Sequence, residues 1–208
     1  MKLNGRIVSA VVGIVVVAAA VVAVVSSGSS STGDTVVTTV PSVDSTTSDN
    51  SPAADSVPPA EYQPVRITGT ALPVMPEAGT DVGIGSKVPV VNGYNFNGDA
   101  VSLDVAASGT PTMVVFLAHW CPHCNREIPR ILEWASTNGV PDGLRIVGVA
   151  TGSRNDYPNW PPSAWLADMG WKWEKLADTQ DGQVFSAYGG TSFPTMVLVG
   201  PDGTVRNR

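Results

Sequence analysis

The chain has 208 residues, with 43% hydrophobic and 14% charged side chains, two cysteines and a formal net charge of −6. This length suits one domain with appendages. Residues 66–208 carry 10 basic and 13 acidic side chains, so the part rich in apolar runs stands near −3. Nothing in this charge balance suggests nucleic-acid binding, which relies on an excess of basic side chains.

The N-terminus predicts a membrane anchor. Lys2 and Arg6 precede residues 7–25, nineteen residues without a charge, which is enough to cross a bilayer as a helix. A cleaved signal peptide is the alternative, although its apolar region usually spans only about 7–15 residues. We expect a cytoplasmic N-terminus over residues 1–6 and a retained transmembrane signal-anchor over 7–25. No Lys or Arg follows until Arg66, so the positive-inside rule places the rest of the chain outside the cytoplasm, on the periplasmic or extracellular face of the cell membrane.

Residues 26–65 predict a tether. They consist of Ser, Thr, Pro, Asp and small residues, with five acidic side chains and no basic one. Such a segment cannot bury enough apolar surface to fold, so we expect a disordered linker spanning roughly 35 Å as a coil. The folded domain is expected over residues 66–208.

Apolar runs of strand length follow in that domain, at residues 113–118, 145–150 and 195–199. Consecutive apolar residues are typical of strands covered on both faces. Upstream, residues 88–103 predict an edge extension with a hairpin at Asn97-Gly98.

A helix is predicted from Pro122 to about residue 137, because Pro suits a first turn and Gly139 suits the end. Lying between two buried strands, it predicts a right-handed parallel crossover. Its apolar positions, Cys124, Ile128, Ile131, Leu132 and Ala135, form one stripe. Cys124 should therefore face the core, whereas Cys121, before the first turn, should stay at the surface. Further helices are expected over 163–169 and 183–188.

Both cysteines of the chain lie in Cys121-Pro122-His123-Cys124, preceded by Trp120. This spacing is that of a reversible disulfide. A Cys at a strand-to-helix turn lies over the unpaired N–H groups of the helix, which favour thiolate over thiol. Thiolate is the nucleophile of disulfide exchange.

Other roles for the pair are disfavoured. A zinc site needs a second pair of ligands, and only His119 and His123 remain. Covalent haem attachment needs His where Asn125 stands. A purely structural disulfide across so short a loop would restrain the unfolded chain little. We expect no metal and no cofactor.

Glu127, three residues after Cys124, borders the apolar stripe, where partial desolvation would suit it to handling protons. A simple interaction with the helix dipole is an equal alternative. The Phe193-Pro194 bond, before the last apolar run, is a candidate for a cis peptide. Four tryptophans in the second half either pack in the core or line a substrate groove, and the former is the commoner role; they are Trp160, Trp165, Trp171 and Trp173.

The Trp120–Cys124 motif at a strand–helix junction, the helix-kinking Pro129 and Phe193-Pro194-Thr195 resemble the thioredoxin fold over residues 80–205. The spacing Cys-x-x-Cys-x-x-Glu-x-Pro, with the anchor and the upstream hairpin, more narrowly resembles the membrane-anchored TlpA/ResA-like thiol-disulfide oxidoreductases, which have a redoxin or AhpC-TSA-type domain. The resemblance implies an α/β fold: a thioredoxin-like three-layer sandwich with a central mixed β-sheet and an N-terminal hairpin extension. Because the sequence stops at Arg208, where relatives continue, we expect the last strand and the C-terminal helix to be missing. Either part of a sheet face is then bare, or the chain is truncated.

The same resemblance implies roles for the site residues. Cys121 attacks, Cys124 resolves and Glu127 handles protons, since Val115 stands where thioredoxin has a buried Asp. Pro122 and His123 tune the potential, and this dipeptide is typical of DsbA-type oxidants, which leaves the direction of electron flow open. Trp120, Phe193 and a cis Pro194 contact the substrate chain. A peroxiredoxin would need Pro at Val114 and Thr at Ala118, so its peroxide site is absent.

The expected function is that of an extracytoplasmic, membrane-tethered thiol-disulfide oxidoreductase in cell redox homeostasis. Its partners would be client proteins with thiols or disulfides and a membrane electron donor or acceptor. The alternative is a non-catalytic thioredoxin-fold electron-relay or binding module serving one dedicated partner, for example in cytochrome c maturation.

Overall fold

The computed structural model describes residues 56–208. The predicted cytoplasmic end, the anchor over 7–25 and the tether up to residue 55 lie outside the described residues. Within 56–208, the helices are all too short or too polar to cross a bilayer.

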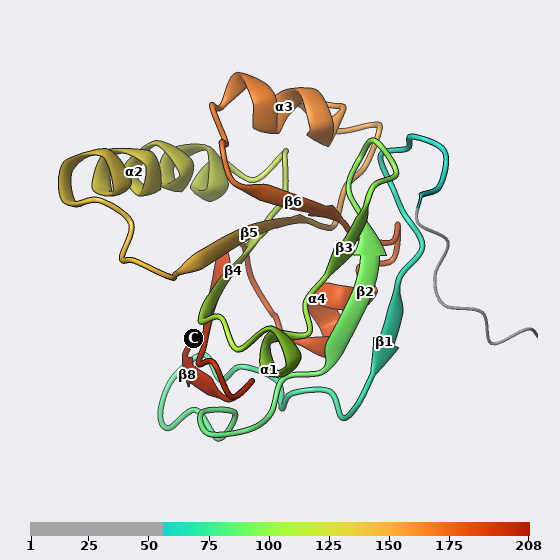
Figure 1. Ribbon diagram of the computed structural model, residues 1–208. Coiled ribbons are helices and arrows are strands. Elements are labelled where there is room, and N and C mark those ends of the chain that lie inside the picture. Colours follow the sequence, from blue (N-terminus) through green and yellow to red (C-terminus); the bar gives the residue numbers. More distant parts are fainter. Residues whose placement is uncertain (1–55) are drawn as a thin grey trace, which may run out of the picture. The chain divides into compact units, whose positions relative to one another are not determined.

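One mixed sheet forms the centre of the domain (Figure 1). Its strand order is β1-β2-β6-β5-β4-β7-β8, and β3 pairs with β2 off this path. β4, β5 and β6 are parallel, and the other pairings are antiparallel. The strands are β1 Arg66–Thr68, β2 Val90–Tyr94, β3 Ala100–Ser102, β4 Thr112–Leu117, β5 Arg145–Ala150, β6 Glu174–Ala177, β7 Thr195–Val199 and β8 Val205–Asn207.

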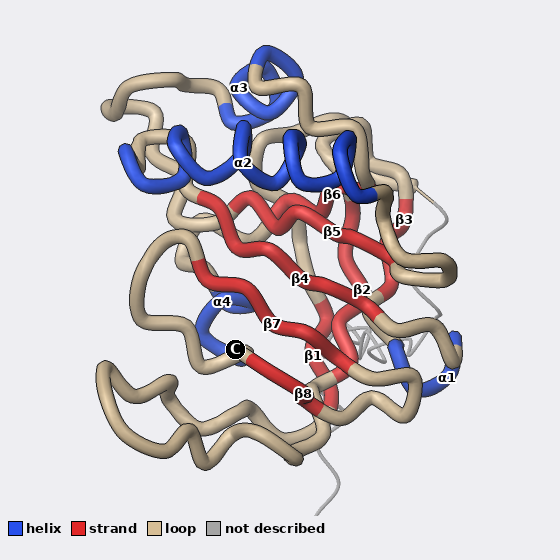
Figure 2. Tube along the Cα trace, turned by 90° about the vertical axis from the view of Figure 1, so that its left-hand side faces the viewer, coloured by secondary structure: helices blue, strands red, loops and turns tan. Residues whose placement is uncertain are grey.

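Helices cover both faces of the sheet, so the predicted three-layer α/β sandwich is confirmed (Figures 1 and 2). The helices are α1 Val105–Ser108, α2 Pro122–Asn138, α3 Pro162–Asp168 and α4 Gln183–Ala187. α2 and α3 share one core with Val115 and Leu117 of β4. α1 and α4 share the other with Val114 and Phe116. Successive strand residues point to opposite faces, which is why a run of apolar residues builds both cores.

α2 begins and ends close to the predicted residues. Pro122 occupies its first turn, and Gly139 follows its end with φ +75°. The predicted stripe is confirmed, because Cys124, Ile128, Ile131 and Ala135 are its buried residues. The strands predicted at 113–118, 145–150 and 195–199, and the parallel crossover that α2 makes, are also confirmed.

The hairpin at Asn97-Gly98 is confirmed as well, with β2 antiparallel to β3 and Gly98 at φ +86°. The expectation that the last strand is missing was wrong, because β8 pairs with β7. No helix follows β8 within the described residues. The short elements β1, β6 and α1 had not been predicted, since they lack a run of strongly apolar residues.

Residues 56–65, assigned from the sequence to the tether, pack on the domain. The Glu61 carboxylate accepts hydrogen bonds from the backbone N–H and hydroxyl of Ser163 at the start of α3, at 3.0 and 2.5 Å. The Tyr62 hydroxyl donates to the Ser153 carbonyl at 3.0 Å, and Gln63 is buried.

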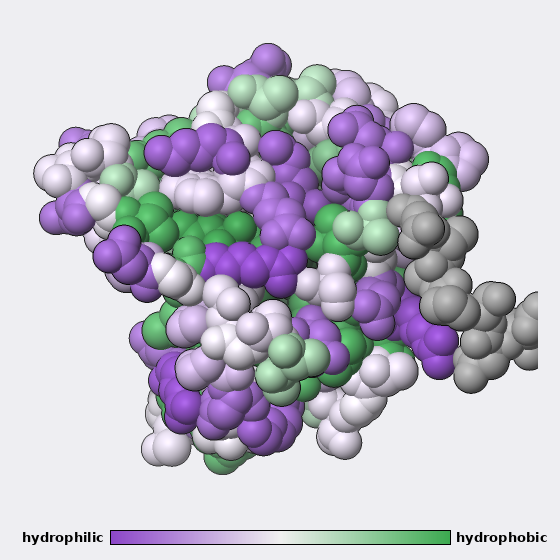
Figure 3. Space-filling model, in the orientation of Figure 1, coloured by the Kyte–Doolittle hydropathy of each residue, from purple (hydrophilic) through white to green (hydrophobic). Residues whose placement is uncertain are grey.

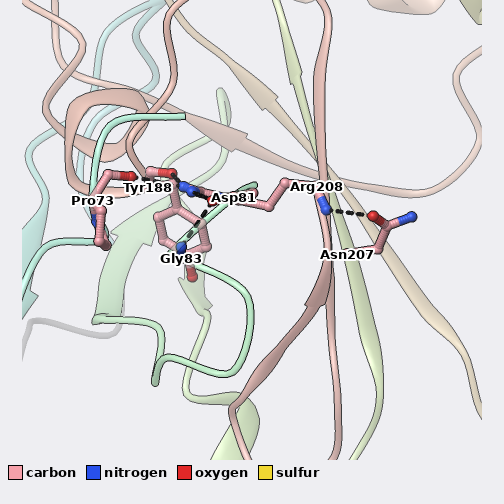
Figure 4. A network of polar contacts seen from close by, with 6 residues as sticks. All are labelled: Pro73, Asp81, Gly83, Tyr188, Asn207 and Arg208. Atoms are coloured by element: carbon pink, nitrogen blue, oxygen red, sulfur yellow. Dashed lines mark hydrogen bonds and ion pairs between the residues drawn. The ribbon is translucent and has the colours of Figure 1, made fainter. Parts of the chain in front are cut away.

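A polar network ties the loop before β2 to the end of β8 (Figure 4). The Arg208 guanidinium has no exposed surface and pairs with both oxygens of Asp81. It also donates to the carbonyls of Pro73 and Tyr188, at 2.9 and 3.2 Å. The hydrogen bonds that Asp81 accepts from Arg208 hold the pKa of its carboxyl below the usual value.

Apolar surface is open beside α2, as Figure 3 shows on the face drawn there. Two adjoining pockets share Met113 of β4, Met196 of β7 and Trp134 of α2, and the second also contains Leu198. Trp134 and Leu198 are each 38% exposed. A partly bare sheet face, as expected from the sequence, is therefore present.

Candidate thiol site

The cysteine pair lies at the carboxyl end of β4, where the chain turns into α2. The backbone N–H of Cys121 donates to the Ala118 carbonyl at 3.0 Å and closes this turn. Cys121 is the N-cap of α2, with extended backbone at φ −77° and ψ 119°. Its sulfur therefore lies at the positive end of a 17-residue helix, where a thiolate is stabilised.

Cys121 is less accessible than the sequence predicted. Only 5% of it is exposed, so the expectation of a surface thiol was wrong. Its Sγ lies 3.5 Å from the Phe193 carbonyl oxygen, within reach for the thiol to donate. The loop before β7 covers the sulfur, and periodicity along α2 carries no information about that loop.

Cys124 is fully buried, as predicted. Its Sγ accepts a hydrogen bond from the Ala118 N–H at 3.5 Å. Burial raises the pKa of Cys124 to about 12, and the neighbouring Cys121 adds to the rise, while the Ala118 N–H opposes it. Both cysteines are free thiols in this structure. The two thiols of the pair thus have unequal environments.

The predicted cis peptide at Phe193-Pro194 is confirmed. The Phe193 ring packs against Phe185 and edge-on against Trp120, with centroids at 4.6 and 5.8 Å. It also lies over Gly152, where a Cβ would come within 3.2 Å of Cζ of the ring, at a backbone φ of +56°. A side chain at residue 152 would therefore displace the wall beside the thiol.

Trp120 closes another side of the site. Its indole Nε1 donates to the Gly152 carbonyl at 2.8 Å, and its ring packs against Tyr157 at 5.4 Å. The structure thus brings Trp120 and Phe193, two residues predicted to contact a substrate, into direct contact beside Cys121.

Pro122 and His123 occupy the first turn of α2, where His123 is exposed. An Arg126 guanidinium nitrogen lies 3.0 Å from His123 Nδ1. Because a guanidinium can only donate, Nδ1 accepts in this geometry. The positive charge beside the start of the helix therefore lies on Arg126, which the sequence had not indicated, and His123 holds its guanidinium there.

Within residues 56–208, no hydrogen bond or ion pair joins Glu127 to either sulfur. Its side chain is 31% exposed, pairs with Arg130 at 3.4 Å and lines the apolar groove with Met113 and Met196. Among the described residues, Arg130 is its one polar partner. The proton-handling role of Glu127 stays a prediction.

Asn125 was missed in the sequence. Its amide donates to the Cys121 carbonyl at 3.0 Å and accepts from the Trp165 indole at 2.8 Å. The available signal for Asn125 in the sequence was a polar residue immediately after the second cysteine.

The tryptophans of the second half differ in burial. Trp165 and Trp171 are buried in the core, whereas Trp160 is 36% exposed.

Asp178, also missed, follows β6 at the same edge of the sheet. It is 1% exposed and accepts from the backbone N–H groups of Thr179, Val184 and Phe185 at 2.8, 2.9 and 3.1 Å. Burial raises the pKa of Asp178, although these hydrogen bonds lower it in part. Its position after a parallel strand, where sites gather in open α/β sheets, could have indicated it.

Within residues 56–208, no cluster of three or more His, Cys, Asp or Glu side chains could hold a metal ion.

The fold and the site together define the class of protein. A mixed sheet between two layers of helices, with Cys-x-x-Cys at a strand–helix turn that faces a cis-proline loop, is typical of a thioredoxin-like protein. The family model described as "AhpC/TSA family" matches residues 84–208, more than half of the chain. The chain therefore belongs to the AhpC/TSA family.

Solved structures of bacterial redox proteins are similar to the chain. One is the thioredoxin domain of a thiol-disulfide oxidoreductase from Bacteroides vulgatus, with 26% identity, 60% of this chain and 86% of that chain covered, and a TM-score of 0.48. Another is a thiol:disulfide interchange protein from a Bacteroides species, with 26% identity, 59% and 78% covered, and a TM-score of 0.48. A secreted Mycobacterium tuberculosis disulfide oxidoreductase has 26% identity, 55% and 78% covered, and a TM-score of 0.43.

Proposed function

We propose that the chain is a TlpA/ResA-like thiol-disulfide oxidoreductase, tethered to the cell membrane by residues 7–25, whose domain exchanges disulfides with client proteins outside the cytoplasm. The observation that carries the redox assignment is the asymmetry of the pair. Cys121 lies at a helix N-terminus under a backbone carbonyl, while Cys124 is sealed and has a raised pKa. Such a pair has one sulfur suited to attack and one suited to resolve.

In the first step, the Cys121 thiolate attacks one sulfur of a client disulfide. A bond forms between the two sulfurs, the client S–S bond breaks, and the released client thiolate takes up a proton. The Phe193 carbonyl, 3.5 Å from Cys121 Sγ in the reduced protein, marks where the client backbone would pass.

In the second step, Cys124 loses its proton and attacks the Cys121 sulfur. The mixed disulfide breaks, the second client sulfur leaves as a thiol, and Cys121–Cys124 becomes a disulfide. Two electrons have then passed from the protein to the client, and the reverse sequence oxidises a client dithiol. Since burial raises the pKa of Cys124, this step needs a base, and we assign it to Glu127, directly or through water.

The redox assignment is tested by turnover. The reduced full-length chain should accelerate insulin reduction by dithiothreitol, and Cys121→Ser should abolish the acceleration. Cys124→Ser should accumulate mixed disulfides with client proteins because nothing resolves them, and the double variant is the matched control. Equal trapping by Cys121→Ser and Cys124→Ser would contradict the assigned roles.

The tether is tested separately. The full-length chain should sediment with membranes and require detergent for release, and a protease added to intact cells stripped of any outer envelope should digest the domain. Recovery of the chain in the soluble fraction would contradict the anchor without bearing on the thiol chemistry.

The relay module serving one partner is favoured by one observation, the 5% exposure of Cys121, because a covered thiol reaches few generic disulfides. Failure to reduce insulin, combined with rapid exchange with one membrane redox partner, would select this second function.

A further inference from the structure

We propose that His119 is a positioning residue: it holds the loop between β5 and α3, residues 151–161, against the turn that carries Cys121, and so sets one wall of the client-binding surface. The inference rests on the proposed function, because a wall beside Cys121 matters only if clients approach that sulfur. The loop, defined here as the β5–α3 loop, contains Tyr157 and Trp160.

His119 uses both ring nitrogens on this loop. Its Nε2 lies 3.0 Å from the Arg154 backbone nitrogen, and its Nδ1 lies 2.6 Å from the Pro158 carbonyl oxygen. A backbone N–H can only donate, so Nε2 accepts and Nδ1 carries the proton that is donated to Pro158. The ring is 1% exposed and its nitrogens have no further capacity, so His119 cannot exchange protons with the thiols in this arrangement.

Two neighbours complete the attachment. The Asn159 side-chain amide donates to the His119 carbonyl at 2.9 Å, and the Trp120 indole donates to the Gly152 carbonyl at 2.8 Å. Residues 119 and 120 thus bind the loop at both ends. Asn159 has φ +64°, a left-handed conformation that Asn tolerates better than most residues.

The loop presents aromatic surface beside a thiol that is hardly exposed. Tyr157 and Trp160 are 37% and 36% exposed. Tyr157 packs against Trp120 at 5.4 Å, and the Arg154 guanidinium lies 4.3 Å above the Tyr157 ring. Trp160 packs edge-on against His119 itself, at 5.8 Å. A client segment with apolar or aromatic side chains beside its cysteine would fit this wall.

The distinguishing test compares a protein disulfide with a small one. His119→Leu removes both hydrogen bonds of the ring while keeping an apolar side chain. In insulin reduction by the full-length chain we expect KM to rise about threefold to tenfold, which corresponds to the loss of one or two hydrogen bonds. We expect kcat to change less than about twofold. Reaction of reduced Cys121 with the small disulfide DTNB should change less than about twofold, because DTNB does not span the loop.

Asn159→Gly supplies a second variant in case His119→Leu fails to fold. Glycine keeps the left-handed backbone without strain and deletes only the amide that donates to His119. Asn155→Gly is the matched control, because Asn155 is exposed in the same loop and makes no hydrogen bond to residues 118–121 among the described contacts. Asn159→Gly should raise KM for insulin, Asn155→Gly should not, and His119→Asn, which keeps a donor near the Nδ1 position, should recover part of the loss.

Amide exchange gives a readout independent of activity. The Arg154 amide should exchange about threefold to tenfold faster in Asn159→Gly than in Asn155→Gly. Unchanged exchange and unchanged KM in a folded variant would overturn the positioning role, as would equal losses with insulin and DTNB. If the wild-type chain reacts with neither disulfide, the proposed function fails. The positioning role in client binding then fails with it, and faster exchange would show only that His119 holds the loop.

Discussion

Cys124 should be almost inert toward alkylation in the folded, reduced protein. The test uses Cys121→Ser, in which Cys124 is the one remaining thiol. Burial is the largest cause of the raised pKa of Cys124, and this variant leaves the burial in place while removing the smaller contribution of Cys121. At the wild-type pKa of about 12, Cys124 has a thiolate fraction of about one in ten thousand at pH 8, whereas a thiol of pKa 9.0 has about one in ten. Since only thiolate reacts, titration alone predicts a rate about a thousandfold lower than in the unfolded chain, and the absence of exposed surface lowers it further.

The assay is a time course with iodoacetamide, read by intact mass, at each half unit from pH 7 to 10. The rate for Cys121→Ser should rise about tenfold per pH unit over the whole range, with no plateau below pH 10. In denaturant the same variant should react like an ordinary thiol. Cys124→Ser, which leaves Cys121 at the helix N-terminus, should react faster than Cys121→Ser at every pH.

A plateau for Cys124 between pH 8 and 9 would refute the reasoning, because it would mean that burial does not penalise the thiolate. Alkylation of Cys124 before Cys121 in the wild-type chain would refute it independently, by reversing the assigned roles.

The raised pKa of Cys124 also makes the stability of the reduced protein depend on pH. The folded, reduced protein should lose stability as the pH rises above about 9, because the unfolded chain releases the Cys124 proton first.

Three further predictions follow from charges outside the pair. Burial raises the pKa of Asp178, so the native state is destabilised as pH rises from about 4 through the folded pKa, and Asp178→Asn should flatten that slope in urea titrations. Arg208→Met should cost about 3 kcal/mol in urea unfolding at pH 7 by leaving Asp81 unpaired, and this difference should shrink below pH 4, as Asp81 becomes protonated. Arg126→Ala should lower the reduction potential of the pair by tens of millivolts in glutathione titrations, because it removes a positive charge from the first turn of α2, and His123→Ala should lower it less, because it removes only the acceptor that holds Arg126 there.

The fold could be predicted wherever one strong local pattern decided it. β4, β5 and β7 are short apolar runs, and α2 has a proline in its first turn, a glycine after its end and one apolar stripe. β6 was not predicted, because Glu174 and Lys175 interrupt any apolar pattern. It forms a strand because β5 and β2 lie on either side and pair with it. Such tertiary pairing overrides local propensity.

The site was predictable where the chemistry is local and unpredictable where loops meet. The spacing of Cys121 and Cys124 predicted the redox pair, and the apolar stripe of α2 correctly predicted that Cys124 is buried. The cover over Cys121 comes from Phe193, 72 residues away, so no local pattern could show it. His119 was considered only as a metal ligand, because its partners in the β5–α3 loop lie 35 to 40 residues further along the chain.

One turn joins these features. The Ala118 N–H donates to Cys124 and the Ala118 carbonyl accepts from the Cys121 N–H, so a single residue holds both cysteines in place. The next two side chains, His119 and Trp120, hold the β5–α3 loop. These contacts fix the loop as a wall beside the turn that carries Cys121. Because Cys121 is already at the helix N-terminus and only 5% exposed, we infer that the loop governs which disulfides reach the sulfur more than how reactive the sulfur is.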